Sequence, residues 1–219
     1  MSDHIKLQNA FETIKGVYRN DIMCTLTQPQ IDEYKKKLER FEKVNTNKKF
    51  STKEKGDALE NISKYLLEIS GGLFEITKNL RTSTNEIDLL MQLSTEKRIL
   101  INYDFIDKRL TEFIAECKNY DKTVNVTYVG KLISLMDTNK INFAILFSYH
   151  GISGKGWSNA SGLIKKYYLS KESVDERPCI IDFNYENFCD ILNGNNLLDI
   201  INNKISALRY DTDYKNFIK

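Results

Sequence analysis

The stretch "FIAECKNYD", residues 113–121, places a carboxylate and an ammonium group, Glu116 and Lys118, with one residue between them. Apolar residues alternate around this pair, which predicts a β-strand, and side chains two positions apart on a strand lie on the same face. A lone Glu-x-Lys pair on a strand is common and carries little weight alone. An unpaired ion beside buried strands is costly. This face is therefore either solvated or used for chemistry.

A second carboxylate, Asp88, lies in the apolar stretch "EIDLLMQLS". Asp88 could be an ordinary strand residue, but if its strand neighbours the strand of Glu116, both carboxylates approach one point. Two carboxylates on rigid strands suit Mg²⁺, which prefers oxygen ligands and retains several waters. A lysine beside such a site can orient or help to deprotonate an attacking water, and it can stabilise charge developing on a phosphate. The pattern therefore permits phosphodiester hydrolysis.

Three predicted strands position these groups. The stretches "FEITKNLRT" and "EIDLLMQLS" have the composition of strands and are joined by the polar turn "STN", and "LTEFIAECKNY" is the third strand. We expect the three to form a meander. Residues 95–110, which separate the second strand from the third, alternate charged and apolar groups and are interpreted as a lengthened hairpin or an insertion.

Helices precede and follow these strands. Ser51 and Glu54 form a capping-box pattern for a helix that ends at Gly71 and Gly72. The remaining predicted elements are helix 126–136, an apolar strand at 141–150, helix 158–169, strand 178–185 and helix 196–208. This order predicts an α/β fold.

The first fifty residues predict two amphipathic helices. Apolar residues at helical spacing are Leu7, Phe11, Ile14 and Tyr18 in the first helix, and Ile31, Tyr34, Leu38 and Phe41 in the second. The polar segment 44–56 lacks periodicity and predicts a boundary between an N-terminal helical extension, 1–50, and a main domain, 51–219. The lysine-rich "YKKKLERFEK" fits a solvated helix face better than a DNA-contacting one.

Composition narrows the classes of function. The formal net charge is only +2, so nucleic-acid binding would need a local basic face. The four cysteines form no C-x-x-C pair and there are only two histidines, which disfavours a zinc site and a disulfide framework. Neither a membrane span of ~18 apolar residues nor a secretory signal is evident. We expect a cytoplasmic protein without a membrane partner.

Residues from about 56 to 208 resemble the PD-(D/E)xK nuclease superfamily, and most closely its Mrr-like restriction endonuclease branch. The resemblance rests on "KGDALENISKYLLE", "NEIDLLMQL" and "FIAECKNYDKTVNVTYVGKL", followed in order by "INFAILFSYHGIS" and "CIIDFNYENFCDIL". It implies a restriction-endonuclease-like core with a mixed central sheet flanked by helices. The first fifty residues lie outside it.

The resemblance assigns roles to individual residues. It implies that Asp88 and Glu116 are metal ligands, that the backbone carbonyl of Cys117 is a further ligand, and that Lys118 is the catalytic lysine. Glu60, in "GDALE", matches an acidic position that helps to bind or organise the metal, although it lies off the apolar stripe of its helix and could simply be solvated. The Mrr branch often has Gln where this chain has Glu116, and the interval between Asp88 and Glu116 is long.

The implied activity is a Mg²⁺-dependent endonuclease, with Mn²⁺ as a substitute, that acts on double-stranded DNA in restriction or phage defence. Partners implied by relatives are a second copy in a homodimer or higher homo-oligomer, other defence-system subunits, or a small activator. Two alternatives stay open: a signal- or partner-activated non-specific effector DNase, and a catalytically inactive DNA-binding or assembly subunit.

The glycine-rich stretch "HGISGKGWSNASG" fits no Walker pattern. Because it follows a strand and precedes a helix, Lys155 or Ser158 could meet a phosphate, but a plain connecting loop is the better interpretation. His150 is interpreted as a structural or surface residue. Trp157 is expected to pack in the core rather than to stack on a base.

Overall fold

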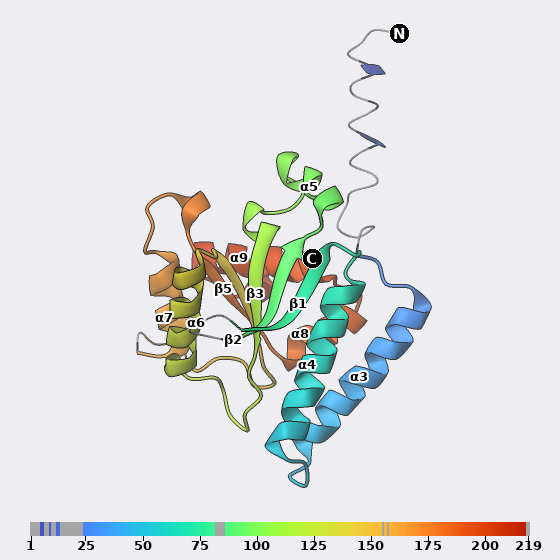
Figure 1. The fold of residues 1–219 in the computed structure, drawn as a ribbon, viewed down its shortest axis with the longest axis vertical. Coiled ribbons are helices and arrows are strands. Elements are labelled where there is room, and N and C mark those ends of the chain that lie inside the picture. The colour runs from blue at the N-terminus through green and yellow to red at the C-terminus, as the bar shows by residue number, and fades with distance from the viewer. Residues whose placement is uncertain are drawn as a thin grey trace.

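A five-stranded mixed sheet forms the centre of the molecule (Figure 1). The computed structural model describes residues 24–81, 86–154, 156 and 158–217, together with the separate positions 5, 6, 9, 12 and 13. The strands are β1 (Phe74–Arg81), β2 (Glu86–Leu93), β3 (Glu112–Cys117), β4 (Phe143–Phe147) and β5 (Cys179–Phe183).

The strands lie in chain order across the sheet. β1, β2 and β3 pair antiparallel, which confirms the predicted meander. β4 then pairs parallel with β3, and β5 parallel with β4. Parallel neighbours require crossover connections, which here carry helices. The α/β class with a mixed sheet flanked by helices is therefore confirmed.

Helices cover both faces of the sheet, with α3 and α4 on one side and α6 and α7 on the other (Figure 1). The helices are α3 (Gln28–Thr46), α4 (Thr52–Ile69), α5 (Ile99–Asn102), α6 (Val126–Asn139), α7 (Ala160–Tyr168), α8 (Tyr185–Leu192) and α9 (Leu197–Tyr210). Short 3-10 turns lie at Thr95–Lys97, Lys108–Thr111, Val174–Glu176 and Tyr214–Phe217. Within the described residues, no helix has the length and apolarity needed to span a membrane.

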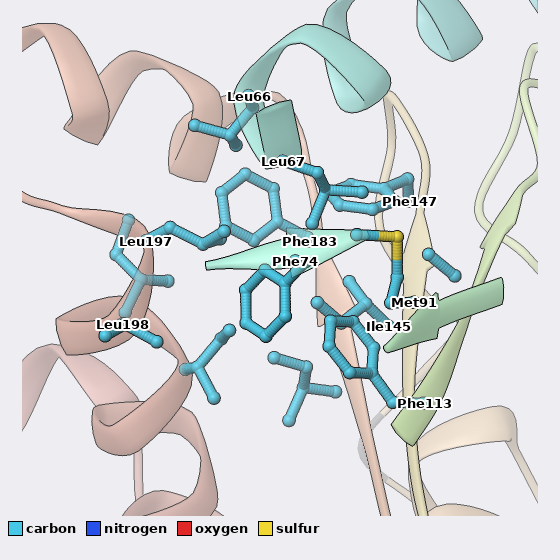
Figure 2. Close-up of a cluster of buried hydrophobic side chains, with 14 of the residues drawn as sticks. Leu66, Leu67, Phe74, Met91, Phe113, Ile145, Phe147, Phe183, Leu197 and Leu198 are labelled. Atoms are coloured by element: carbon cyan, nitrogen blue, oxygen red, sulfur yellow. The ribbon is translucent and has the colours of Figure 1, made fainter. Parts of the chain in front are cut away.

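Two apolar cores result from the alternation of strand side chains. The larger core packs the α3, α4, α8 and α9 side of the sheet, and Phe113 lies within it against Phe74 and Phe143, with ring centroids 5.1 and 5.5 Å away (Figure 2). The smaller core joins the other face to α6 and α7 and includes Ile114 and Leu146. Both faces of the central strands are therefore buried, and a polar residue there needs a partner.

The start and end of α4 follow the sequence prediction. Ser51 Oγ accepts a hydrogen bond from the Glu54 backbone N–H at 3.3 Å, and the Glu54 carboxylate accepts one from the Ser51 backbone N–H at 2.8 Å. Gly71 and Gly72 both have positive φ, 68° and 58°, beyond the end of the helix. The predicted capping box and glycine stop are both confirmed.

The segment 95–110 is an insertion of short helical turns, so of the two predicted alternatives the insertion is confirmed and the lengthened hairpin is wrong. Thr95–Lys97, α5 and Lys108–Thr111 replace it. Leu100, Ile106 and Leu110 are buried in the larger core. These apolar anchors fold the segment back onto the body of the protein, which a two-stranded ribbon with strict alternation would not do.

Outcomes at the N-terminus and after β5 differ from element to element. The helix α8 was not predicted and follows β5 directly. The second N-terminal helix is confirmed as α3, whose side chains Tyr34, Leu38, Phe41 and Val44 are buried in the larger core. The first predicted helix, with its stripe at Leu7, Phe11, Ile14 and Tyr18, and the turn at 83–85 lie outside the described residues. The boundary between 50 and 51 stays a prediction.

Candidate functional site

Asp88 and Glu116 lie on neighbouring strands, β2 and β3, and their side chains meet. The antiparallel register pairs Leu90 with Ile114 and Leu89 with Ala115, and each carboxylate belongs to the next residue beyond that last pair. The two carboxyl groups are within hydrogen-bonding reach of each other, and Lys118 contacts both. The sequence prediction that the two carboxylates approach one point agrees with this placement.

Lys118 lies just past the end of β3, and its ammonium contacts both carboxylates. It forms an ion pair with Glu116, and its Nζ lies 3.6 Å from Asp88 Oδ2. The backbone N–H of Lys118 donates to the carbonyl of Phe147 on β4 at 2.9 Å. The lysine is therefore fixed to the sheet through its backbone while its side chain reaches across the ends of β2 and β3.

The carboxylate of Asp88 also replaces a missing backbone bond of the sheet. Asp88 Oδ2 accepts a hydrogen bond from the backbone N–H of Cys117 at 3.1 Å. The pairing of β2 with β3 stops at Leu89 and Ala115, whereas β3 continues to pair with β4 as far as Cys117. Asp88 thus satisfies a donor that the strand ladder has released.

All three charged side chains are partly exposed, at 27% for Asp88, 18% for Glu116 and 24% for Lys118. Burial raises the pKa of Glu116, an effect that the Lys118 charge opposes and the Asp88 charge reinforces. Burial acts to lower the pKa of Lys118, but the carboxylates of Glu116 and Asp88 outweigh it, and the pKa of Lys118 is raised. Lys118 is therefore a cation at neutral pH, suited to charge stabilisation rather than to proton abstraction.

Glu60 lies on the exposed side of α4, beside the same strands. It lines a cavity of about 250 Å³ with Asp88, between α4 and the β1–β2 hairpin; the other lining residues are Asp57, Asn61, Lys64, Lys78, Asn79 and Leu89. Partial desolvation raises the pKa of Glu60, and the negative charges of Asp88 and Asp57 act in the same direction. Glu60 is thus close enough to Asp88 for their charges to interact.

The thiol of Cys117 lies on the α4 side of the sheet. Cys117 is half-buried and packs against the larger core. Burial raises the pKa of this thiol, with a further contribution from the negative charge of Asp88. The thiol is therefore a protonated packing group, and the backbone N–H of Cys117 is the group that donates to Asp88.

The donor set suits a hard divalent cation. No three His, Cys, Asp or Glu side chains within the described ranges converge as a ready-made metal cage. Mg²⁺ is typically bound by one or two carboxylates and keeps its remaining ligands as waters and substrate oxygens. Asp88 and Glu116 fit that pattern, and Glu60 adds a carboxylate nearby.

The remaining sequence candidates lie apart from these groups. His150 is exposed and packs edge-on against Tyr149, with ring centroids 4.9 Å apart, in agreement with a surface role. Ser158 is exposed in the loop before α7. Lys155 and Trp157 lie outside the described residues.

Two residues beside the site were missed by sequence reasoning. Asn119 is buried directly after Lys118, and Lys55 is buried on α4. A signal for Lys55 was present, because it falls on the helical spacing of the buried residues Leu59 and Ser63. Nothing in the local pattern marks Asn119.

Comparison with known proteins gives no relative: no protein-family model, no curated protein and no solved structure matches this chain. The function is therefore inferred from the residues and from the contacts of Asp88, Glu116 and Lys118. These contacts join two carboxylates and one cation at the end of two paired strands.

Proposed function

We propose that the protein is a metal-dependent deoxyribonuclease of the PD-(D/E)xK type, an endonuclease that hydrolyses phosphodiester bonds in DNA. The observation that carries the proposal is the contact of the Lys118 ammonium with the carboxylates of both Asp88 and Glu116. Asp88 and Glu116 lie on strands, which hold reacting groups more precisely than loops do. The arrangement offers two anionic ligands and one cation within reach of a single phosphate.

Each residue has a defined part in the proposed reaction. Asp88, Glu116 and the backbone carbonyl of Cys117 would hold Mg²⁺, or Mn²⁺ in its place, and Glu60 would help to organise it. The bound ion would supply Lewis-acid activation of the phosphate and of a water. Lys118, which is protonated, would orient the nucleophilic water and stabilise the negative charge that develops on the phosphate oxygens.

The proposed biological setting follows from the resemblance to restriction endonucleases. We propose a cytoplasmic enzyme in restriction or phage defence that acts on double-stranded DNA as a homodimer or higher homo-oligomer. Other defence-system subunits or a small activator are further proposed partners. An effector DNase that cuts without sequence preference after activation uses the same site.

The second candidate is a catalytically inactive DNA-binding or assembly subunit. The contact of Lys118 with both carboxylates is equally compatible with this candidate, because a purely structural ion cluster has the same contacts. The two candidates differ in one property. A nuclease site must admit a divalent cation between Asp88 and Glu116, whereas a structural cluster need not.

A plasmid-cleavage assay tests the proposal. The purified protein is incubated with supercoiled DNA and Mg²⁺ or Mn²⁺, beside the variants Glu116→Ala and Lys118→Ala. Glu112→Gln is the matched control, because Glu112 lies on the same strand and its exposed carboxylate contacts Gln92 rather than the site. We expect Lys118→Ala to lower the rate by about 10²–10³-fold, which is the usual cost of losing a charge-stabilising group.

The pattern of DNA products distinguishes the candidate functions. Discrete fragments favour a sequence-specific endonuclease, and a smear favours an effector. Equal inactivity of wild type, Glu116→Ala and Lys118→Ala with every metal and activator favours the inactive subunit. Cleavage by Glu116→Ala at the wild-type rate would assign the activity to other residues.

A further inference from the structure

The segment that follows Lys118 is tied to helix α4 by a buried amide. Asn119 is 7% exposed, and its Nδ2 donates to the backbone carbonyl of Lys55 at 2.6 Å. In an α-helix that carbonyl already accepts a bond from the N–H four residues on, so Asn119 supplies an additional bond. The bond therefore serves to attach residue 119 to α4 rather than to complete the helix.

A second tie uses the side chain of Lys55. This lysine is 6% exposed, which is unusual because an ammonium group is seldom buried without a partner. Its Nζ forms an ion pair with the carboxylate of Asp121, whose side chain is 81% exposed. Lys55 thus holds the chain at two points, residues 119 and 121, within three residues of Lys118.

The amide oxygen of Asn119 indicates that this residue does more than stabilise the fold. Asn119 Oδ1 is buried and accepts no hydrogen bond within the described part of the chain. A buried acceptor without a donor is destabilising, and such groups are rare in native proteins. An apolar side chain of the same size would avoid that cost while losing only the bond to Lys55.

Lys118 lies between this attachment and the sheet. On one side its backbone N–H donates to Phe147 of β4, and on the other Asn119 is held by α4. The same helix carries Glu60, one and a half turns beyond Lys55. The attachment therefore fixes the distance between the helix with Glu60 and the strand end with Lys118.

We propose that Lys55 and Asn119 are positioning residues, which hold the backbone at 118–121 so that the Lys118 ammonium stays between Asp88 and Glu116. The expected effect on cleavage rate rests on the proposed function. The expected effect on the position of Lys118 does not. A misplacement of about 1 Å at a reacting group can lower a rate by about 10²-fold.

The experiment compares Asn119→Leu and Lys55→Met with Lys53→Met, an exposed lysine on the same helix. We expect the first two variants to lower kcat by roughly 10–100-fold with KM within about twofold, and Lys55→Arg to recover most of the rate. Lys53→Met should behave as wild type. Thermal unfolding measured in parallel identifies variants that have lost their structure. The comparison of kcat is then made only among folded variants, so a fall in kcat reports positioning.

Amide hydrogen exchange gives a readout that needs no activity. The Lys118 amide should exchange about tenfold faster in Asn119→Leu and Lys55→Met, because the opening that breaks its bond to Phe147 becomes easier. Faster exchange in a protein without nuclease activity would support the positioning role and reject the proposed function. Unchanged kcat and unchanged exchange in both variants, or a fall in kcat that only follows the unfolded fraction, would overturn the inference.

Discussion

Replacing Lys118 with methionine should destabilise the protein without metal, because two carboxylates would then face each other with no cation between them. The net charge of the cluster Asp88, Glu116 and Lys118 changes from −1 to −2. At the 3.6 Å separation of Lys118 and Asp88, the Coulomb energy is about 5 kcal/mol at an effective dielectric constant of ~20. Because all three side chains are partly exposed, we expect a net loss of about 1–3 kcal/mol.

Mg²⁺ should reverse this loss if the carboxylates form a metal site. A site with a Kd on the order of 1 mM gains about 1.4 kcal/mol at 10 mM Mg²⁺, which is roughly 3–6 °C in Tm for a chain of this length. The Lys118→Met variant should gain more than wild type, because its site is more negative. Thermal unfolding in EDTA and in 10 mM Mg²⁺ measures both effects, with exposed Lys122→Met as the control.

Two outcomes would refute this reasoning. If Lys118→Met and wild type unfold at the same temperature in EDTA, the ion cluster does not contribute as the distances indicate. If the variant is less stable but Mg²⁺ stabilises neither protein, the cluster is structural and the proposal of a metal-dependent nuclease fails. An Asp88→Asn, Glu116→Gln double variant should show no response to Mg²⁺.

Two further predictions concern the stability of the fold around the site, one in the larger core and one in the segment 95–110. Phe41→Ala should lower the free energy of unfolding by about 3–5 kcal/mol in a single urea transition, because Phe41 is fully buried against Tyr149 and Phe188; two separate transitions would mean that α3 belongs to an independent extension. Burial disfavours the charge of Asp107, yet Arg109 lowers the pKa of Asp107, so Asp107→Asn should cost about 2–4 kcal/mol at pH 7. That difference should shrink as the pH falls from about 4, where the Asp107 carboxyl of the unfolded chain takes up a proton, through the lower pKa of the folded state; a constant difference would contradict the ion pair.

Local rules predicted the elements that carry the site. The capping box at Ser51 and Glu54 and the alternation around Glu116 depend on neighbours in sequence, and both were read correctly. For residues 95–110 the sequence left both a lengthened hairpin and an insertion open, because the burial of Leu100 and Ile106 depends on core residues that lie far away in sequence. Such tertiary anchoring leaves no periodic signal.

The sequence predicted that the three charged residues lie close together, but not which groups hold them in place. Ionic residues are conspicuous in apolar strand sequences, as at Asp88, Glu116 and Lys118. Pairing of the strands in a meander brings the three together. Asn119 contacts the carbonyl of Lys55, and a backbone carbonyl has no signature in sequence. The bond from Cys117 N–H to Asp88 was missed for the same reason, since it exists only because the ladder of β2 and β3 ends early.

That bond gives Asp88 two separable roles, one structural and one electrostatic. Asp88→Asn keeps an oxygen that accepts from the Cys117 N–H, so its free energy of unfolding should stay within about 1 kcal/mol of wild type while cleavage is lost. Asp88→Ala leaves that N–H without its acceptor and should cost about 1–3 kcal/mol more. Urea unfolding and plasmid cleavage of both variants measure the two roles. If Asp88→Asn were as unstable as Asp88→Ala, the charge of Asp88, and not its hydrogen bond, would hold the strand ends in place. Stability would then no longer distinguish a catalytic site at Asp88 from a structural ion cluster.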